Sequence, residues 1–503
     1  MHPSIIAAQS PDKPAVIMGE TGLAVTYDEL DARSNQGAQL FRALGLKRGD
    51  VIGVLLENRS ELFEIVWAAQ RSGLYYTCIS TRLVPAEVGF ILEDSEARLL
   101  IAGANVDDDI ARLGVPLFTL GPRNGARDFL MERARMPATP IADESPGNDM
   151  LYSSGTTGRP KGIKPPLPEG AIGQTNGLTD LGRTVYGMDR DTVFLSPAPL
   201  YHAAPLRWCM SVQRLGGTVV VMAKFDPSAA LALVERHRVT HAQWVPTHFI
   251  RMLKLDPSDR ARHDVSSLRS VFHAAAPCPV EVKRAMIDWW GPIIHEFYGG
   301  TEANGLTSIG PEEWLERPGS VGRPIWGSPR ICDEQDNVLS PRATGTIYFA
   351  EGAPFEYHRD PEKTAASRNR HGWTTIGDVG WLDEDGYLYL TDRKSHMIIS
   401  GGVNIYPQEV EDQLVLHPRV ADVAVIGAPD PDMGEQVVAV VEPVAWEDAG
   451  SALEQELLDW LRPRVSRVKM PRRIDFERAL PRTPVGKLLK RVLRDRYWPR
   501  DTV

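Results

Sequence analysis

The sequence predicts a layered α/β protein followed by a smaller α+β unit. Short apolar runs alternate with helical segments up to about Gly322, a β-rich stretch extends to Leu390, and a compact mixed segment follows Asp392. Alternation of buried strands and amphipathic helices is typical of largely parallel sheets that are covered by helices. At 503 residues the chain exceeds what one hydrophobic core usually supports, so at least two domains are expected.

The elements are predicted in order from periodicity and turn residues. A hairpin is expected across Gly19–Gly22, and an amphipathic helix is expected from Tyr27 to about Leu44. Between 322 and 390, short β-rich pieces alternate with turn signals, as in a small barrel or a distorted sheet. The other expected strands are 51–56, 98–102, 218–222, 240–245, 345–349, 386–390, 420–426 and 473–476, and the other helices are 61–72, 227–238 and 453–461.

Composition excludes several classes of function. The formal net charge is −10 with acidic and basic residues interspersed, which argues against nucleic acid as a partner. The four cysteines are far apart and form no C-x-x-C pair, so neither a zinc site nor a disulfide framework is expected, and a reducing cytoplasm is the simplest location. No signal peptide and no membrane span is expected, because no segment approaches the ~18 apolar residues that a span needs.

The most informative stretch is the run Ser153–Gly162, SSGTTGRPKG. Its glycines let the backbone approach an anion, its hydroxyls and N–H groups donate to it, and Lys161 adds a positive charge. It differs from the common nucleotide loop, in which Lys directly follows the second glycine. Asp149–Tyr152 is interpreted as the end of a short buried strand, so the loop would leave a sheet at its carboxyl edge. The candidate phosphate ligands are Ser153, Ser154, Gly155, Thr156, Thr157, Gly158 and Lys161.

Four further motifs follow in order: Tyr298–Glu302, then Thr375–Asp378, then Asp392-Arg393 followed by Ile399–Pro407, and finally Pro481–Lys487. Together with the loop they resemble the AMP-forming adenylating superfamily, which includes acyl-CoA synthetases, adenylation domains of peptide synthetases and firefly luciferase. The chain is most similar to acid:CoA ligases.

The resemblance implies a domain organisation. The N-terminal domain, 1–392, would hold two doubly wound α/β subdomains and a small β-rich subdomain at about 322–392. The C-terminal α+β domain, 393–503, would be mobile. The active site would lie between the two domains.

The resemblance also implies roles in forming an acyl-adenylate. A carboxylate must attack the α-phosphate of ATP, so cations and oriented dipoles are needed where two anions meet. Thr301 would contact the α-phosphate, Glu302 would bind Mg²⁺, and Lys487 would bridge the carboxylate and the α-phosphate. The adenosine would be held by Ala275, Ala276, Pro277, Tyr298, Gly299, Gly300, Asp378 and Arg393.

In the second half-reaction the family rotates its C-terminal domain about a hinge, which matches Lys394 and Ser395 here. Gly401 and Gly402 would then lie along the pantetheine arm of coenzyme A. This chain departs from the family at Ser395 and at His396, where a pivot Asp or Lys and an acidic residue are usual.

The acyl pocket is assigned to His202, Trp244 and Val245, which match the family's pocket mouth and wall. A packed histidine without a role in binding is the alternative for His202. Ala274 and Ala275 replace glycines that are common in the family. Because these segments carry no charged residue, an apolar acid (fatty, aromatic or alicyclic) is expected.

The predicted function is therefore an AMP-forming acyl-CoA synthetase that uses ATP, Mg²⁺ and coenzyme A. One alternative is an adenylating enzyme that loads the acyl group onto a carrier protein. The other is a nucleotide-binding regulator without turnover. Assembly of the chain as a homodimer is neither predicted nor excluded.

Overall fold

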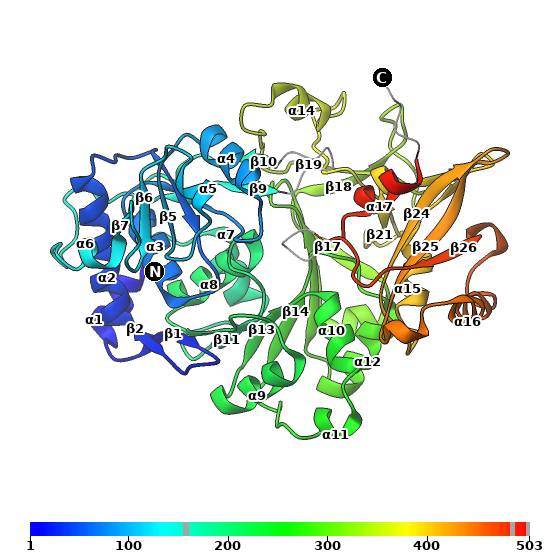
Figure 1. Cartoon of the computed structure of the whole chain (residues 1–503), viewed down its shortest axis with the longest axis horizontal. Helices are drawn as coiled ribbons and strands as arrows, with labels where there is room; N and C mark the ends of the chain where they lie inside the picture. The colour runs from blue at the N-terminus through cyan, green and yellow to red at the C-terminus, as the bar shows by residue number, and fades with distance from the viewer. Residues whose placement is uncertain (154–159, 483–487, 499–503) are drawn as a thin grey trace. The chain divides into compact units, whose positions relative to one another are not determined.

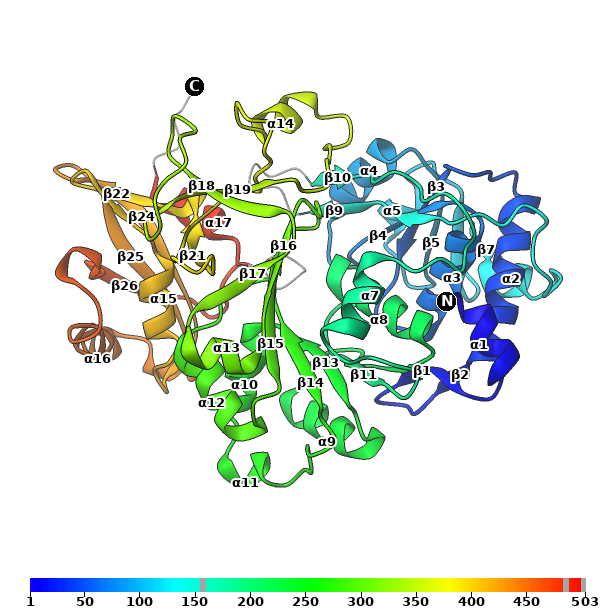
Figure 2. The same cartoon turned by 180° about the vertical axis from the view of Figure 1, so that it is seen from behind.

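The computed structural model describes residues 1–153, 160–482 and 488–498, and the fold is mixed α/β (Figure 1, and Figure 2 from behind). Contacts divide the chain into two compact units. Unit 1 comprises Met1–His273, Ile293–His295 and Phe355–Thr364, and unit 2 comprises the remaining described residues from Ala274 onward. The predicted boundary at about residue 393 lies within unit 2 and stays a prediction.

Unit 1 contains a parallel sheet of strand order β7-β6-β5-β3-β4-β8. Its strands are β3 (Val51–Leu55), β4 (Tyr75–Cys78), β5 (Ala97–Gly103), β6 (Leu117–Leu120), β7 (Arg127–Asp128) and β8 (Asn148–Asp149). The helices of this region are α1 (Pro3–Gln9), α2 (Tyr27–Ala43), α3 (Ser60–Arg71), α4 (Pro85–Asp94), α5 (Asp108–Ala111) and α6 (Phe129–Arg133). The predicted β-α-β order is confirmed here.

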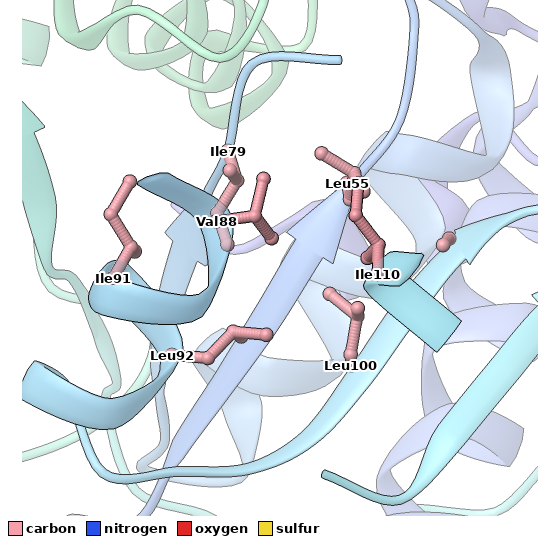
Figure 3. Packing of buried hydrophobic residues seen from close by; sticks show 8 residues of the cluster. Leu55, Ile79, Val88, Ile91, Leu92, Leu100 and Ile110 are labelled. Carbon is pink, nitrogen blue, oxygen red and sulfur yellow. The ribbon is translucent and has the colours of Figure 1, made fainter. Parts of the chain in front are cut away.

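Both faces of this sheet are covered by helices. On one face, Val88 of α4 packs with Leu55 and Leu100 of the strands (Figure 3). On the other face, Phe118 of β6 meets Phe129 of α6 with ring centroids 6.3 Å apart. Because successive side chains of a strand point to opposite faces, a strand between two helical layers is apolar along its whole length, as the central strand β3 is.

A second, mostly parallel set of strands in unit 1 has the order β14-β13-β11-β12-β1-β2. β1 and β2 pair antiparallel, which confirms the predicted hairpin. The strands are β1 (Pro14–Met18), β2 (Ala24–Thr26), β11 (Val193–Ser196), β12 (Thr218–Val221), β13 (His241–Trp244) and β14 (Ser270–His273). The helices are α7 (Gly177–Thr184), α8 (Ala203–Leu215), α9 (Pro227–His237), α10 (Pro246–Leu253) and α11 (Pro257–Arg260).

The expectation of one continuous strand over Asp149–Tyr152 is wrong. β8 ends at Asp149 beside β4, and β9 (Leu151–Ser153) then pairs antiparallel with β10 (Lys161–Ile163) in a separate two-stranded sheet. Met150 is fully buried between the two strands. The apolar run predicts burial correctly, but the change of hydrogen-bonding partner depends on residues distant in sequence.

Unit 2 contains an antiparallel arrangement of order β15-β16-β17-β21-β20-β19-β18. The strands are β15 (Ile294–Gly299, which enters unit 2 at Glu296), β16 (Leu306–Ile309), β17 (Ser320–Trp326), β18 (Ser328–Cys332), β19 (Gly345–Ala350), β20 (Asp378–Leu382) and β21 (Leu388–Arg393). The helices are α12 (Val280–Trp290), α13 (Pro311–Glu316) and α14 (Pro361–Ala366, which begins in unit 1). The predicted change to β-rich texture is confirmed.

The last segment of unit 2 is a small α+β unit, as predicted. Its strands are β22 (Ile398–Ser400), β23 (Val403–Ile405), β24 (Val420–Asp430), β25 (Gly434–Pro443) and β26 (Arg473–Phe476), and only β26 is parallel to its neighbour, β25. Its helices are α15 (Gln408–Leu414), α16 (Ser451–Leu461) and α17 (Lys490–Tyr497), with short 3₁₀ turns η1 (Lys394–His396), η2 (Trp446–Asp448) and η3 (Arg467–Lys469). None of the helices in the described ranges is both long and apolar enough to cross a membrane.

Candidate active site

Three predicted adenosine-binding residues converge in unit 2. Tyr298 lies near the end of β15, and Asp378 and Arg393 are directly paired residues on β20 and β21. The Tyr298 hydroxyl donates to Asp378 Oδ2 at 2.8 Å, and Arg393 Nε lies 3.1 Å from Asp378 Oδ1. Strand pairing therefore brings together side chains that are up to 95 positions apart in sequence.

The environment keeps the Tyr298 hydroxyl protonated. Burial, followed by the neighbouring Asp378 carboxylate, raises the pKa of Tyr298 well above its usual value. The ring packs against Phe349, with centroids 6.2 Å apart and planes 27° apart. Tyr298 is thus a fixed donor to Asp378, and its predicted contact with adenine stays a prediction.

The turn after β15 explains one glycine of the motif. A Cβ at Gly300 would lie 2.7 Å from Glu302 Oε2 and 3.1 Å from Ile376, so a larger residue would displace the Glu302 carboxylate. Thr301 and Glu302 are half-buried. Among the described residues, no group of three or more His, Cys, Asp or Glu would hold a metal ion. A single carboxylate suits Mg²⁺ that also binds substrate phosphates, so Glu302 fits the predicted role.

The segment predicted to cover the adenine adopts a backbone that glycine favours. Ala275 has φ of 77°, in the left-handed region, although it carries a Cβ. Ala275 and Ala276 are exposed, and Pro277 is half-buried just before α12. The replacement of a common glycine by Ala275 therefore occurs without loss of the glycine-type conformation.

The predicted phosphate loop starts on β9 and ends on β10 in unit 1, with Ser153 paired to Lys161 in the antiparallel register. Lys161 Nζ lies 5.2 Å from the centroid of the Tyr357 ring. Gly162 allows close packing, since a Cβ there would be 3.0 Å from the Tyr152 ring. The other predicted phosphate ligands lie outside the described residues: Ser154, Gly155, Thr156, Thr157 and Gly158.

The predicted acyl-pocket residues lie in unit 1. His202 precedes α8, Trp244 ends β13, and Val245 precedes α10. Burial lowers the pKa of His202 to about 4, so its imidazole is neutral at neutral pH. The side chain of Trp244 is 1% exposed.

Sequence reasoning missed His248 in the same wall. Its ring stacks on Phe225 with centroids 3.9 Å apart and lies 6.0 Å from the Trp244 ring. Burial lowers its pKa to about 3. The aromatic residues around it, Trp244 and Phe249, were a sequence signal that this histidine is part of an apolar cluster.

The predicted hinge lies next to a buried carboxylate. Lys394–His396 form the turn η1, and His396 Nδ1 is 3.2 Å from Asp392 Oδ1. The backbone N–H of Gln408, at the start of α15, donates to Asp392 Oδ2 at 3.1 Å. Burial opposes the charge on Asp392, but the hydrogen bond from His396 and the charge of Lys490 outweigh it, so the pKa of Asp392 is lowered. His396, which stands where the family usually has an acidic residue, therefore has a hydrogen-bonding partner in Asp392.

The two glycines assigned to coenzyme A have left-handed backbones, with φ of 56° at Gly401 and 78° at Gly402. A Cβ at Gly402 would meet no atom within 4 Å, so its conformation alone accounts for the glycine in this structure. The predicted passage of pantetheine beside Gly402 stays a prediction. The residue Lys487 lies outside the described residues.

Comparison with known proteins identifies relatives over nearly the whole chain. The family model described as AMP-binding enzyme matches residues 5–355, and the model of the AMP-binding enzyme C-terminal domain matches residues 409–487. The chain is 32% identical over 501 residues to long-chain-fatty-acid–CoA ligase FadD13 of Mycobacterium tuberculosis (98% of this chain, 97% of the relative). It is 35% identical over 500 residues to feruloyl-CoA synthase of an Amycolatopsis species (98% and 97%).

A third relative, fatty acid–[acyl-carrier-protein] ligase ScoC of Streptomyces coeruleorubidus, is 32% identical over 515 residues (98% of this chain, 95% of the relative). Among solved structures, o-succinylbenzoate CoA synthetase of Bacillus subtilis with its acyl-adenylate superposes with a TM-score of 0.84 at 28% identity, covering 98% of this chain and 97% of that one. The same enzyme has been solved with ATP and magnesium ion, with a TM-score of 0.81 at 28% identity over 98% of each chain.

Proposed function

Because this chain belongs to the AMP-binding enzyme family, we propose that it is an AMP-forming acyl-CoA synthetase that acts on an apolar carboxylic acid. Its substrates are the acid, ATP and coenzyme A. The relatives with whole-chain similarity include ligases named for fatty and aromatic acids, which supports this class of acid.

The first half-reaction forms an acyl-adenylate. A carboxylate oxygen of the acid attacks the α-phosphorus of ATP, a new P–O bond forms, and the bond to pyrophosphate breaks. In this proposal Lys161 and the loop 153–158 hold the β- and γ-phosphates, and Thr301 and Lys487 stabilise the charge at the α-phosphate. Mg²⁺, when bound at Glu302, would supply positive charge to the phosphates.

The second half-reaction forms the thioester. The thiol of coenzyme A gives up its proton to solvent, its sulfur attacks the acyl carbonyl carbon to form a C–S bond, and AMP leaves with the electrons of the C–O bond. The domain boundary at about residue 393, the hinge at Lys394 and Ser395, and the path beside Gly401 and Gly402 belong to this part of the proposal.

The observation that carries the nucleotide site is the Tyr298–Asp378–Arg393 contact. Asp378 is 8% exposed, and both of its carboxylate oxygens lie in a directed network, so a sugar presented there would find an oriented acceptor with a cation beside it. Tyr298, Gly299, Gly300 and the 275–277 segment supply the adenine side of the proposed site.

Two neutral histidines support an apolar acid. The pKa of His202 is about 4 and that of His248 is about 3, so the segments assigned to the acyl pocket carry no formal charge at neutral pH. A charged amino acid substrate would need a buried counter-charge, and none is found in these segments.

Acid-dependent exchange of pyrophosphate into ATP, measured over a panel of fatty, aromatic and alicyclic acids, tests the proposal. Exchange with at least one acid, followed by coenzyme A thioester detected by mass spectrometry, is expected. Zero exchange with every acid would favour a nucleotide-binding regulator without turnover.

Loading of an acyl carrier protein is the second candidate, and the similarity to a fatty acid–[acyl-carrier-protein] ligase favours it specifically. Thioester formed on a carrier protein but not on coenzyme A would select this alternative. Assembly as a homodimer and a cytoplasmic location are further parts of the proposal. Light scattering of the purified protein and fractionation of cells test them.

A further inference from the structure

A buried ion pair lies beside the proposed adenosine site in unit 2. Lys283 Nζ is 2.7 Å from Glu296 Oε2, and the two side chains are 0% and 7% exposed. The Lys283 ammonium also lies 4.7 Å from the centroid of the buried Trp314 ring. Neither charged residue is among the residues assigned above to substrate or metal.

Stability alone does not account for such a pair. Burial is the largest influence on both groups, since it lowers the pKa of Lys283 and raises the pKa of Glu296 despite their mutual attraction. Buried ion pairs are often replaced by apolar residues with no loss of stability, because desolvation of the charges offsets their attraction. A role in geometry accounts for the pair better.

The two residues sit on the two segments that flank the adenine. Lys283 lies in the first turn of α12, directly after the segment that contains Ala275, Ala276 and Pro277. Glu296 lies on β15 two residues before Tyr298, so both side chains point to the same face of the strand.

The end of the adenine segment is tied to the same pair. Burial, then the charge of Glu296, raises the pKa of the Cys278 thiol, while Lys283 opposes this effect, so Cys278 lies within electrostatic reach of both. α12 begins after Pro279 without a side-chain cap, and Ala275 holds a left-handed backbone that is strained for a residue with a Cβ. The segment therefore depends on contacts made by α12 to hold its position.

We propose that Lys283 and Glu296 are positioning residues, which hold the adenine-covering segment at a set distance from Tyr298 on β15. The inference rests on the proposed adenosine site. It predicts an effect on nucleotide binding and none on recognition of the acid.

The test uses the full chain and compares Lys283→Met and Glu296→Gln with the double variant Lys283→Met/Glu296→Leu. AMP affinity is measured by calorimetry, which needs no knowledge of the acid, and KM for ATP and acid by pyrophosphate release. The single variants are expected to weaken AMP binding and raise KM for ATP about tenfold, the effect of a modest misplacement of a binding group. KM for the acid is expected to stay within about twofold. A purely structural role would instead change KM for ATP and KM for the acid together.

The double variant separates positioning from stability. It removes both charges, so it is expected to regain the melting temperature of the wild type while AMP affinity remains about tenfold weaker. It also stays informative where a single variant does not fold. Recovery of both the melting temperature and AMP affinity would overturn the inference, as would unchanged AMP affinity in a folded single variant.

Two controls complete the design. Arg71→Met removes another buried cation, which pairs with Asp31 at 3.0 Å and Glu144 at 2.8 Å in unit 1, and it is expected to lower stability with AMP affinity unchanged. Asp378→Ala tests the adenosine site itself. Unchanged AMP affinity in Asp378→Ala would refute that site, whereas a loss there with no loss in Lys283→Met would refute only the positioning role.

Discussion

The proposed nucleotide region of unit 2 and the proposed acyl region of unit 1 are built from opposite chemistry. The first contains charged and polar groups in fixed pairs, Tyr298 with Asp378, Asp378 with Arg393, and Lys283 with Glu296. The second contains Trp244 and Phe225 around His248, whose imidazole is neutral because it is buried.

This difference determines how closely each region specifies its ligand, the nucleotide or the acid. Directed hydrogen bonds and charges define which atoms a ligand must present, so the Tyr298–Asp378–Arg393 group fits the proposed ribose through the hydroxyls that a sugar would donate. An apolar wall selects by shape and volume, and one methylene more or less changes binding only about 10- to 200-fold. Polar pairs therefore specify a ligand atom by atom, whereas an apolar wall specifies a class of ligand.

The largest effect on activity is expected from loss of Lys487, the charge proposed to bridge the carboxylate of the acid and the α-phosphate of ATP. Lys487→Ala is expected to slow acyl-adenylate formation by about 10²-fold or more, because one preorganised charge contact at the α-phosphate is lost. Thioester formation from pre-made acyl-AMP, followed in a single turnover, should stay near the wild-type rate. Equal damage to both half-reactions would contradict this division of roles.

Within the nucleotide region, Asp378→Asn is expected to raise KM for ATP about 10- to 100-fold, the value of hydrogen bonds to a charged group. Tyr298→Phe, which removes one donor to the same carboxylate, should cost less. Steady-state pyrophosphate release with saturating acid measures both. A larger effect from Tyr298→Phe than from Asp378→Asn would mean that Asp378 is not the centre of the site.

The hinge prediction concerns the rates of the two half-reactions relative to each other. Ser395→Pro fixes φ and removes an N–H in η1, so one domain arrangement should become disfavoured and its reaction should slow about tenfold relative to the other. Pyrophosphate release and single-turnover thioester formation report the two reactions separately. If both rates match the wild type in a protein of unchanged melting temperature, the pivot is elsewhere, for example at Lys394.

The smallest expected effect on activity is in the acyl region, where the main change is in pH dependence of stability. His248 has a folded pKa of about 3 and an unfolded value of about 6.5, so the unfolded chain binds the proton first and stability falls as pH drops from about 6.5 toward 3. At pH 4.5, protonation of this one histidine in the unfolded chain lowers the free energy of unfolding by about 3 kcal/mol.

His248→Phe removes that proton-binding group and keeps an aromatic ring. The difference between urea midpoints at pH 7 and pH 4.5 should shrink in this variant, and KM for ATP should be unchanged while the ranking of acids shifts a few-fold. The exposed His371→Gln serves as the control with the wild-type pH dependence. An unchanged pH dependence in His248→Phe would show that the histidine is not buried and neutral.

The sequence alone determined the element types and the family. Strands such as β12 and helices such as α9 follow from local periodicity, and the ordered motifs identify the family because each needs particular residues at fixed spacing. The sequence also placed Tyr298, Asp378 and Arg393 in one site through that resemblance.

Only the tertiary structure decided which side chains meet. The break between β8 and β9, the Lys283–Glu296 pair, the contact of His396 with Asp392 and the place of His248 each depend on residues brought together by strand pairing and packing. Periodicity reports that a residue is buried, but the partner of a buried charge is set by register and helix docking, which no local pattern encodes.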